Sequence, residues 1–245
     1  GNYRRLGAMT VDSALRNAET EKFRGELYDW IVNADAGEAF RTRLRIAMTD
    51  SFGEDKTYGV FVRSDTNVED LPGFTGAGLN LTVPNVVGVD AVLAAIPRVW
   101  ASPFTARAFS WRQSHMSQPE HVYPAVLLMR SVPADKSGVL VTQEIDTGEQ
   151  GWLSVAVNEG VGGAVDGQAA ESLRINIQTG KVRLMAQATA PFRRIVSLQG
   201  GVDKVPVSGV DDVLTAGNVA DLIDFAHELP TRFPPILDAD GNRAP

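Results

Sequence analysis

Apolar side chains recur every three or four positions near the beginning of the chain. Two such sets lie between residues 12 and 50: Leu27, Trp30 and Ile31, and then Phe40, Leu44 and Ala47. This spacing places each set on one face of an α-helix. The sequence therefore predicts two amphipathic helices here, separated near Asp35–Gly37.

A longer helical pattern runs from Asp90 to Trp111 and contains two prolines, Pro97 and Pro103. Proline lacks a backbone N–H and clashes with the preceding turn of a helix. We therefore expect a kinked or interrupted helix over this stretch. A further helical pattern predicts a helix over residues 209–229.

Short apolar runs, typical of β-strands, alternate with these helical stretches. The predicted strands are Tyr58–Val62, Val122–Val132, Gly138–Ile145, Trp152–Val157, Leu173–Ile177 and Val182–Met185. The last two are joined by the polar segment Gln178–Lys181, which predicts a hairpin. Residues Asp65–Val86 carry glycines and prolines and are predicted as a loop. Helices and antiparallel strands together predict an α+β fold.

Composition excludes several classes of protein. The net charge of −7 argues against a broad nucleic-acid surface, which needs clustered Lys and Arg. The absence of cysteine excludes disulfides and thiolate sites. No apolar run approaches the roughly 20 residues of a membrane-spanning helix, so we expect a cytoplasmic protein without membrane contacts. The first residue is Gly. Asp240-Gly241 predicts a hairpin turn close to the last residue, where a second strand would normally follow, so we expect a chain cut at both ends.

The most informative chemical feature is an arginine at a strand end followed by a glycine-rich loop. Arg63 and Ser64 follow the strand Tyr58–Val62, and Gly76 and Gly78 lie in the loop after it. A permanently charged guanidinium, a hydroxyl and backbone N–H groups that can approach a ligand closely suit a polyphosphate. A structural alternative is that Arg63 pairs with the nearby Glu69 or Asp70 and that the glycines only form turns.

Several sequence motifs between about Val60 and Gly167 occur in the same order as in one known family of enzymes. The stretch Val62–Leu79 resembles the V-R-S-S-x-x-x-E-D-x-x-x-x-x-x-A-G signature of the ATP-binding domain in the phosphoenolpyruvate synthase, pyruvate phosphate dikinase and glucan water dikinase family. Val99–Arg112 is similar to the family's R-A-x-x-x-R helix, and Ser137–Gly148 to its S-G-V-x-F-T-x-D-x-x-T-G hairpin. Ordered motifs are more specific than a lone glycine-rich loop.

The resemblance implies an ATP-grasp-like α+β fold, with two lobes and mixed or antiparallel sheets flanked by helices. The lobes would be residues 1–125, with the phosphate loop, and residues 126–245. In this family the two lobes close on ATP and magnesium. The phosphoryl group then passes to a histidine on a separate domain, and from there to pyruvate or a similar acceptor.

The resemblance also implies roles for individual residues. Arg63 would be the catalytic arginine that holds the transferring phosphates. The nucleotide-binding residues would be Arg63, Ser64, Gly76, Gly78, Leu128, Met129, Arg130 and Val132, of which the last four match the linker that contacts adenine. Further candidates are Asp65, Glu69, Asp70, Arg107, Arg112 and Glu171. Arg107 and Arg112 would add positive potential, or would serve as surface or structural arginines.

The sequence also departs from the family pattern. Leu128-Met129-Arg130 stands where the family has a glutamine, and Gly163 stands where it has an acid. Ala169-Ala170-Glu171 stands in place of the family's P-D pair, for which Glu171 would be a substitute. Asp65 replaces a serine, and an acid there would bind magnesium or repel nucleotide. We expect the metal ligands beyond Pro245, no metal site within the chain, and weak or undetectable ATP turnover by the chain alone. The alternatives are a degenerate nucleotide-binding or scaffold module, or an antibiotic phosphotransferase.

Overall fold

The computed structural model describes residues 5–6, 8–9, 14–67, 70–71, 74–75, 79–116, 118, 120–165, 167–209 and 211–234. The contacts between residues divide the chain into two compact units. Unit 1 comprises residues 1–131 and 197–201, and unit 2 comprises residues 132–196 and 202–245. The lobe boundary expected between residues 125 and 126 stays a prediction.

Unit 1 is built around a three-stranded antiparallel sheet with the order β4-β1-β5. The strands are β1 (Gly59–Thr66), β4 (Thr82–Val87) and β5 (Pro124–Arg130). In the central strand, Val62 lies opposite Val83 on β4 and Leu128 on β5. A separate pair of two-residue strands, β2 (Asp70–Leu71) and β3 (Phe74–Thr75), is also antiparallel.

The helices of unit 1 agree with the helical patterns in the sequence. They are α2 (Ala14–Val32), α3 (Glu38–Phe52), α4 (Val89–Ala101), the 3-10 turn η1 (Ser102–Phe104) and α5 (Ala106–His115). The break between the first two is confirmed, and it is held by Asp35, whose Oδ1 accepts the backbone N–H of Gly37 at 2.8 Å. The interruption is also confirmed, because Pro103 lies in η1, between α4 and α5.

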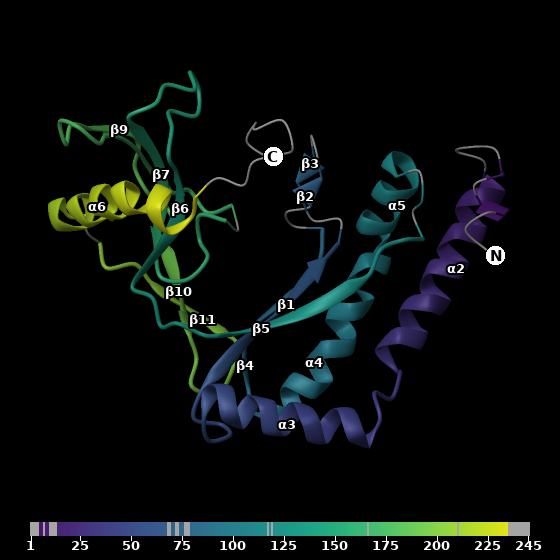
Figure 1. Ribbon diagram of the computed structural model, residues 1–245. Helices are drawn as coiled ribbons and strands as arrows, with labels where there is room; N and C mark the ends of the chain where they lie inside the picture. The colour runs from purple at the N-terminus through teal and green to yellow at the C-terminus, as the bar shows by residue number, and fades with distance from the viewer. Residues whose placement is uncertain are drawn as a thin grey trace. The chain divides into compact units, whose positions relative to one another are not determined.

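The core of unit 1 lies between α4 and one face of its sheet (Figure 1). Val60 and Val62 of β1 are fully buried there against Val92, Ile96 and Val99 of α4. Each such burial contributes about 1.5–3 kcal/mol. Neighbouring residues of a strand point to opposite faces of the sheet. The residues of β1 and β5 that alternate with those packed on the core therefore point to the opposite face.

The predicted loop Asp65–Val86 is wrong at both ends. Residues 64–66 continue β1, because Val126, Ala125 and Pro124 of β5 lie opposite them and supply backbone partners. Residues 82–87 form β4, although Pro84 lies within it. The β1–β4 register is irregular between Val60 and Val62, where Pro84 and Asn85 lie on the partner strand. An irregularity of this kind accommodates a residue that cannot donate to the ladder.

Asn85 ties the turn Ser197–Gly201 into unit 1. Its backbone is left-handed, with φ of 47°. Its side-chain Nδ2 donates to the carbonyls of Ser197 at 2.8 Å and Gly201 at 2.7 Å. Gly59 makes room for this arrangement, because a Cβ there would lie 2.0 Å from Asn85 Oδ1. This contact joins positions more than 110 residues apart, which no local pattern predicts.

Unit 2 contains a four-stranded antiparallel sheet with the order β6-β7-β8-β9. Its strands are β6 (Lys136–Val141), β7 (Trp152–Glu159), β8 (Glu171–Asn176) and β9 (Val182–Ala186). The helix α6 (Ala216–Arg232) packs on one face, where Val155, Val157, Leu173 and Ile175 are buried. The predicted hairpin between the last two strands is confirmed.

Two features of unit 2 differ from the sequence predictions. The antiparallel pair β10 (Phe192–Val196) and β11 (Val202–Pro206) was not predicted, because arginine, lysine and aspartate interrupt both apolar runs. The last helix begins at Ala216 rather than residue 209, because Thr215 and Asn218 form a capping box that sets its first turn.

Helices beside antiparallel sheets confirm the α+β class and agree with an ATP-grasp-like fold. No helix in the described part of the chain combines the length and apolar character needed to cross a membrane.

Candidate functional site

The face of the unit 1 sheet opposite its helical core carries exposed side chains of mixed character. We call it the open face and define it by Phe61, Arg63 and Asp65 of β1 and Ala125, Leu127 and Met129 of β5. Their faces follow from strand alternation and from the register, in which Arg63 lies opposite Leu127 and Phe61 opposite Met129. Leu127 is 48% exposed and Met129 is 42% exposed. The open face therefore offers apolar surface around one arginine.

Arg63 is exposed on this face. Its Nη1 donates to Met129 Sδ at 3.5 Å. Among the described side chains, no carboxylate forms an ion pair with Arg63. The alternative pairing cannot be placed, because Glu69 and the side chain of Asp70 lie outside the described residues. The guanidinium is thus held toward β5 with its charge open to an anion.

The neighbours of Arg63 fall on different sides of the strand. Ser64 is half-buried on the core side, and its backbone N–H donates to the carbonyl of Leu81 at 3.3 Å. Asp65 is exposed and shares the open face with Arg63. Gly76 and Gly78 lie outside the described residues. Sequence order alone would have grouped all these residues, whereas the pleat of β1 separates the Ser64 side chain from Arg63.

The residues expected to form an adenine linker lie mainly within a strand. Leu128 and Met129 belong to β5, and Arg130 is its last residue. The Leu128 side chain packs against the core of unit 1, so it cannot also cover a ligand on the open face. Met129 points to the open face, and Arg130 and Val132 are exposed. Only Met129 of this set is brought beside Arg63.

The two candidate arginines of α5 have different environments. Arg107 is exposed. Arg112 is only 4% exposed; its Nη2 donates to the carbonyl of Pro103 at 2.5 Å, and its guanidinium lies over the rings of Phe104 and Phe109, 5.0 and 5.4 Å from their centroids. A buried guanidinium with these contacts stabilises the junction of η1 and α5. The structural interpretation therefore fits Arg112.

Glu171, the expected substitute acid, is buried in unit 2. It is 1% exposed, and its carboxylate accepts the backbone N–H groups of Val213 at 2.6 Å and Leu214 at 3.0 Å. These bonds hold the segment that leads into α6. Glu171 thus serves the fold and is not presented to a ligand.

An ion pair that the sequence analysis missed organises the acidic turn after β6. Glu144 Oε1 accepts from Arg174 Nε at 2.5 Å, and Asp146 Oδ2 lies 3.1 Å from Arg174 Nη2. Glu144 also accepts N–H bonds from Asp146 and Thr147. The hydrogen bond from Arg174, opposed by burial and aided by those from Thr147, lowers the pKa of Glu144 from 4.5 to about 2. No local signal predicts this pair, because 30 residues separate its members.

The described residues contain no group of three or more His, Cys, Asp or Glu side chains that could hold a metal ion. That the metal ligands lie beyond Pro245 stays a prediction.

Comparison with known proteins relates this chain to nucleotide-binding enzymes. Residues 5–238 match the AMP/ATP-binding domain of pyruvate phosphate dikinase. The chain is 35% identical over 152 residues to a rifampicin phosphotransferase of Bacillus subtilis, covering 62% of this chain and 17% of the relative. It is 34% identical over 150 residues to a probable phosphoenolpyruvate synthase of Methanothermobacter thermautotrophicus, covering 60% of this chain and 22% of the relative.

A third relative is the phosphoenolpyruvate synthase of Pyrococcus furiosus, which is 30% identical over 154 residues. This match covers 63% of the chain and 19% of the relative. The chain therefore spans about a fifth of the length of these relatives.

Proposed function

Because the chain belongs to the family of the pyruvate phosphate dikinase AMP/ATP-binding domain, we propose that it is the ATP-binding part of a larger dikinase-type phosphotransferase. The whole protein would transfer a phosphoryl group from ATP to a histidine on another domain, and then to pyruvate or a similar acceptor. Support comes from the named relatives, which include phosphoenolpyruvate synthases and a rifampicin phosphotransferase and are much longer than this chain.

The observation that carries the proposal is the exposed guanidinium of Arg63 on the open face. Its planar donors suit phosphate oxygens. Negative charge spreads over the phosphoryl oxygens in the transition state, and a fixed cation beside them stabilises it. Arg63 would bind and orient the phosphates, while Leu127 and Met129 would cover the apolar part of the nucleotide.

Magnesium is expected from the family, but the described residues supply no cluster of ligands for it. The roles that we propose for this chain are those of its own side chains. Arg63 holds the phosphates, and Leu127 and Met129 beside it exclude water from the adenine ring.

A second candidate function is a degenerate module of the same family that binds nucleotide or a partner domain without catalysis. Asp65 favours it, because its exposed carboxylate shares the open face with Arg63 and would repel a negatively charged phosphate. The replacement of the family glutamine and of the acid at Gly163 also favours it. The first candidate predicts that the complete parent protein transfers a phosphoryl group from ATP. The second predicts that it binds without transferring one.

The test is calorimetric titration of the chain with ATP and Mg²⁺. We expect Arg63→Ala to weaken binding about ten- to a hundredfold, because a charge-assisted contact to phosphate is lost. Arg63→Lys should recover part of the affinity. Arg98→Ala is the matched control, since Arg98 is an exposed arginine on α4, away from the open face.

Equal ATP affinity in wild type and Arg63→Ala would show that Arg63 is not a phosphate ligand. ATP binding without phosphoryl transfer by the complete parent protein would establish the degenerate module instead. Labelled ATP with pyruvate or an antibiotic as acceptor would separate the two transfer reactions.

A further inference from the structure

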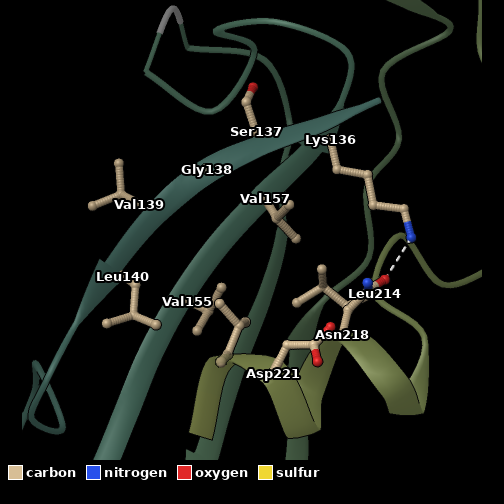
Figure 2. A pocket seen from close by; sticks show the side chains of 11 residues that line it. Lys136, Ser137, Gly138, Val139, Leu140, Val155, Val157, Leu214, Asn218 and Asp221 are labelled. Atoms are coloured by element: carbon tan, nitrogen blue, oxygen red, sulfur yellow. Dashed lines mark hydrogen bonds between the residues drawn. The ribbon is translucent and has the colours of Figure 1, made fainter. Parts of the chain in front are cut away.

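A pocket in unit 2 lies between the β6–β7 side of its sheet and the first turns of α6 (Figure 2). Its volume is about 270 Å³. Leu140, Val155 and Val157 from the sheet, with Leu214 and Leu222, make its apolar walls. The pocket belongs to one unit and shares no residue with the open face of unit 1. The proposed function makes no use of it.

Gly138 keeps the sheet side of this pocket free of a side chain. A Cβ at this position would lie 2.2 Å from the carbonyl oxygen of Ala156 on the neighbouring strand. Any residue larger than glycine at position 138 would clash with the backbone of the neighbouring strand, which cannot move aside as a flexible side chain could. The hollow between Lys136 and Leu140 on β6 is thus a consequence of close strand pairing.

A fixed cation lies on the rim of the pocket. Lys136 Nζ donates to Asn218 Oδ1 at 2.7 Å, the bond drawn in Figure 2. Asn218 is itself held in the capping box of α6, where its Oδ1 also accepts from the backbone N–H and the hydroxyl of Thr215. A lysine ammonium has three N–H donors, and Asn218 uses one. The amine is therefore positioned while keeping donors for another acceptor.

A carboxylate lies on the same rim. Asp221 follows Asn218 by three residues on α6, so both face the pocket. The ion pairs in the described part of unit 2 are made by Arg174, Arg193 and Arg232, and Lys136 and Asp221 are not paired with each other. One positive and one negative group thus border a single apolar hollow without neutralising each other directly.

We propose that this pocket binds a small zwitterion with an aliphatic body, of the class of branched aliphatic α-amino acids. The ligand's carboxylate would accept from Lys136, and its ammonium would donate to Asp221. Its side chain would bury against Leu140, Val155 and Leu222. A simple anion would give Asp221 no positive partner, and a simple amine would give Lys136 no negative partner. Glycine has no side chain, so it would leave the apolar walls exposed to water.

The test is calorimetric titration of the chain with L-leucine, compared with 4-methylpentanoate, isoamylamine and glycine. We expect saturable binding of L-leucine and binding at least tenfold weaker for each of the other three, because each lacks one matched group. Asp221→Asn and Lys136→Met should each weaken L-leucine binding about tenfold or more. Asp224→Asn, an exposed acid on α6 outside the pocket lining, is the control and should bind as wild type does.

Circular dichroism of each variant separates lost binding from lost folding, and Asp221→Asn keeps the size of the side chain. Absence of saturable L-leucine binding to the folded wild type would overturn the proposal. Equal binding of 4-methylpentanoate and L-leucine, or an affinity for L-leucine unchanged in Asp221→Asn, would overturn it as well.

Discussion

Arg63 Nη1 lies 3.5 Å from Met129 Sδ, and this contact crosses from β1 to β5 on the open face of unit 1. The two residues are diagonal neighbours, because Arg63 is opposite Leu127 in the register and Met129 is opposite Phe61. Diagonal neighbours remain within reach of long side chains. A thioether is a weak acceptor and carries no charge. The contact therefore restrains the guanidinium without neutralising it.

The first prediction concerns Met129→Ala. Loss of the sulfur contact and of apolar cover should weaken ATP binding about two- to tenfold, because a thioether is a weak acceptor and only part of one side chain's apolar cover is removed. Stability should change little, since the side chain is half exposed. Titration with ATP and thermal unfolding measure the two effects. Met185→Ala, an exposed methionine on β9, is the control, and equal losses in both variants would contradict the role of Met129.

A second prediction concerns Asp65→Ser, which restores the residue type of the family signature. Removing an exposed carboxylate from the face of Arg63 should raise ATP affinity about two- to fivefold, because it removes repulsion of the phosphates at high dielectric. The gain should shrink at high salt. Titrations at low and high ionic strength check both points, and weaker ATP binding by the variant would show that Asp65 assists the nucleotide instead.

A third prediction concerns acid stability. Because the hydrogen bond from Arg174 lowers the pKa of Glu144 from 4.5 to about 2, the pair's contribution to stability is complete above pH 4.5. It is lost as the pH falls from 4.5 toward 2, when the folded carboxylate becomes protonated. Glu144→Gln should therefore lose less stability than wild type between about pH 5 and about pH 3. Urea unfolding at the two pH values measures this difference.

The control for that experiment is Glu149→Gln, an exposed acid in the same turn. It should follow wild type across the same range. Identical pH dependence in wild type and Glu144→Gln would mean that the ion pair also persists in the unfolded chain, or contributes nothing.

A fourth prediction concerns Glu171→Ala. Two N–H donors, those of the buried Val213 and the half-buried Leu214, would lose their acceptor, so the free energy of unfolding should fall by about 2–4 kcal/mol. Denaturant unfolding measures the change. Glu228→Ala, on the exposed side of α6, should cost much less. The ATP affinity of the folded Glu171→Ala variant should match that of wild type. A loss of ATP binding without a loss of stability would show that Glu171 contributes to nucleotide binding.

The candidate site was only partly visible in the sequence. Arg63 could be identified because several motifs around it occur in a recognisable order. Arg112 belonged to one of these motifs as well, yet its burial over Phe104 and Phe109 depends on how η1 meets α5. Leu128 and Met129 are adjacent in sequence but face opposite sides of β5. Which of the two faces Arg63 depends on register with β1.

The sequence by itself determined the α+β class, the helices α2 and α3, the break at Pro103 and the hairpin between β8 and β9, because these depend on periodicity, proline chemistry and turn residues within short stretches. Only the tertiary structure decided that β1 continues to Thr66, that Pro84 lies in a strand, and that Glu144 pairs with Arg174. Each of these depends on a partner distant in the chain, whose backbone or charge compensates for what the local sequence disfavours.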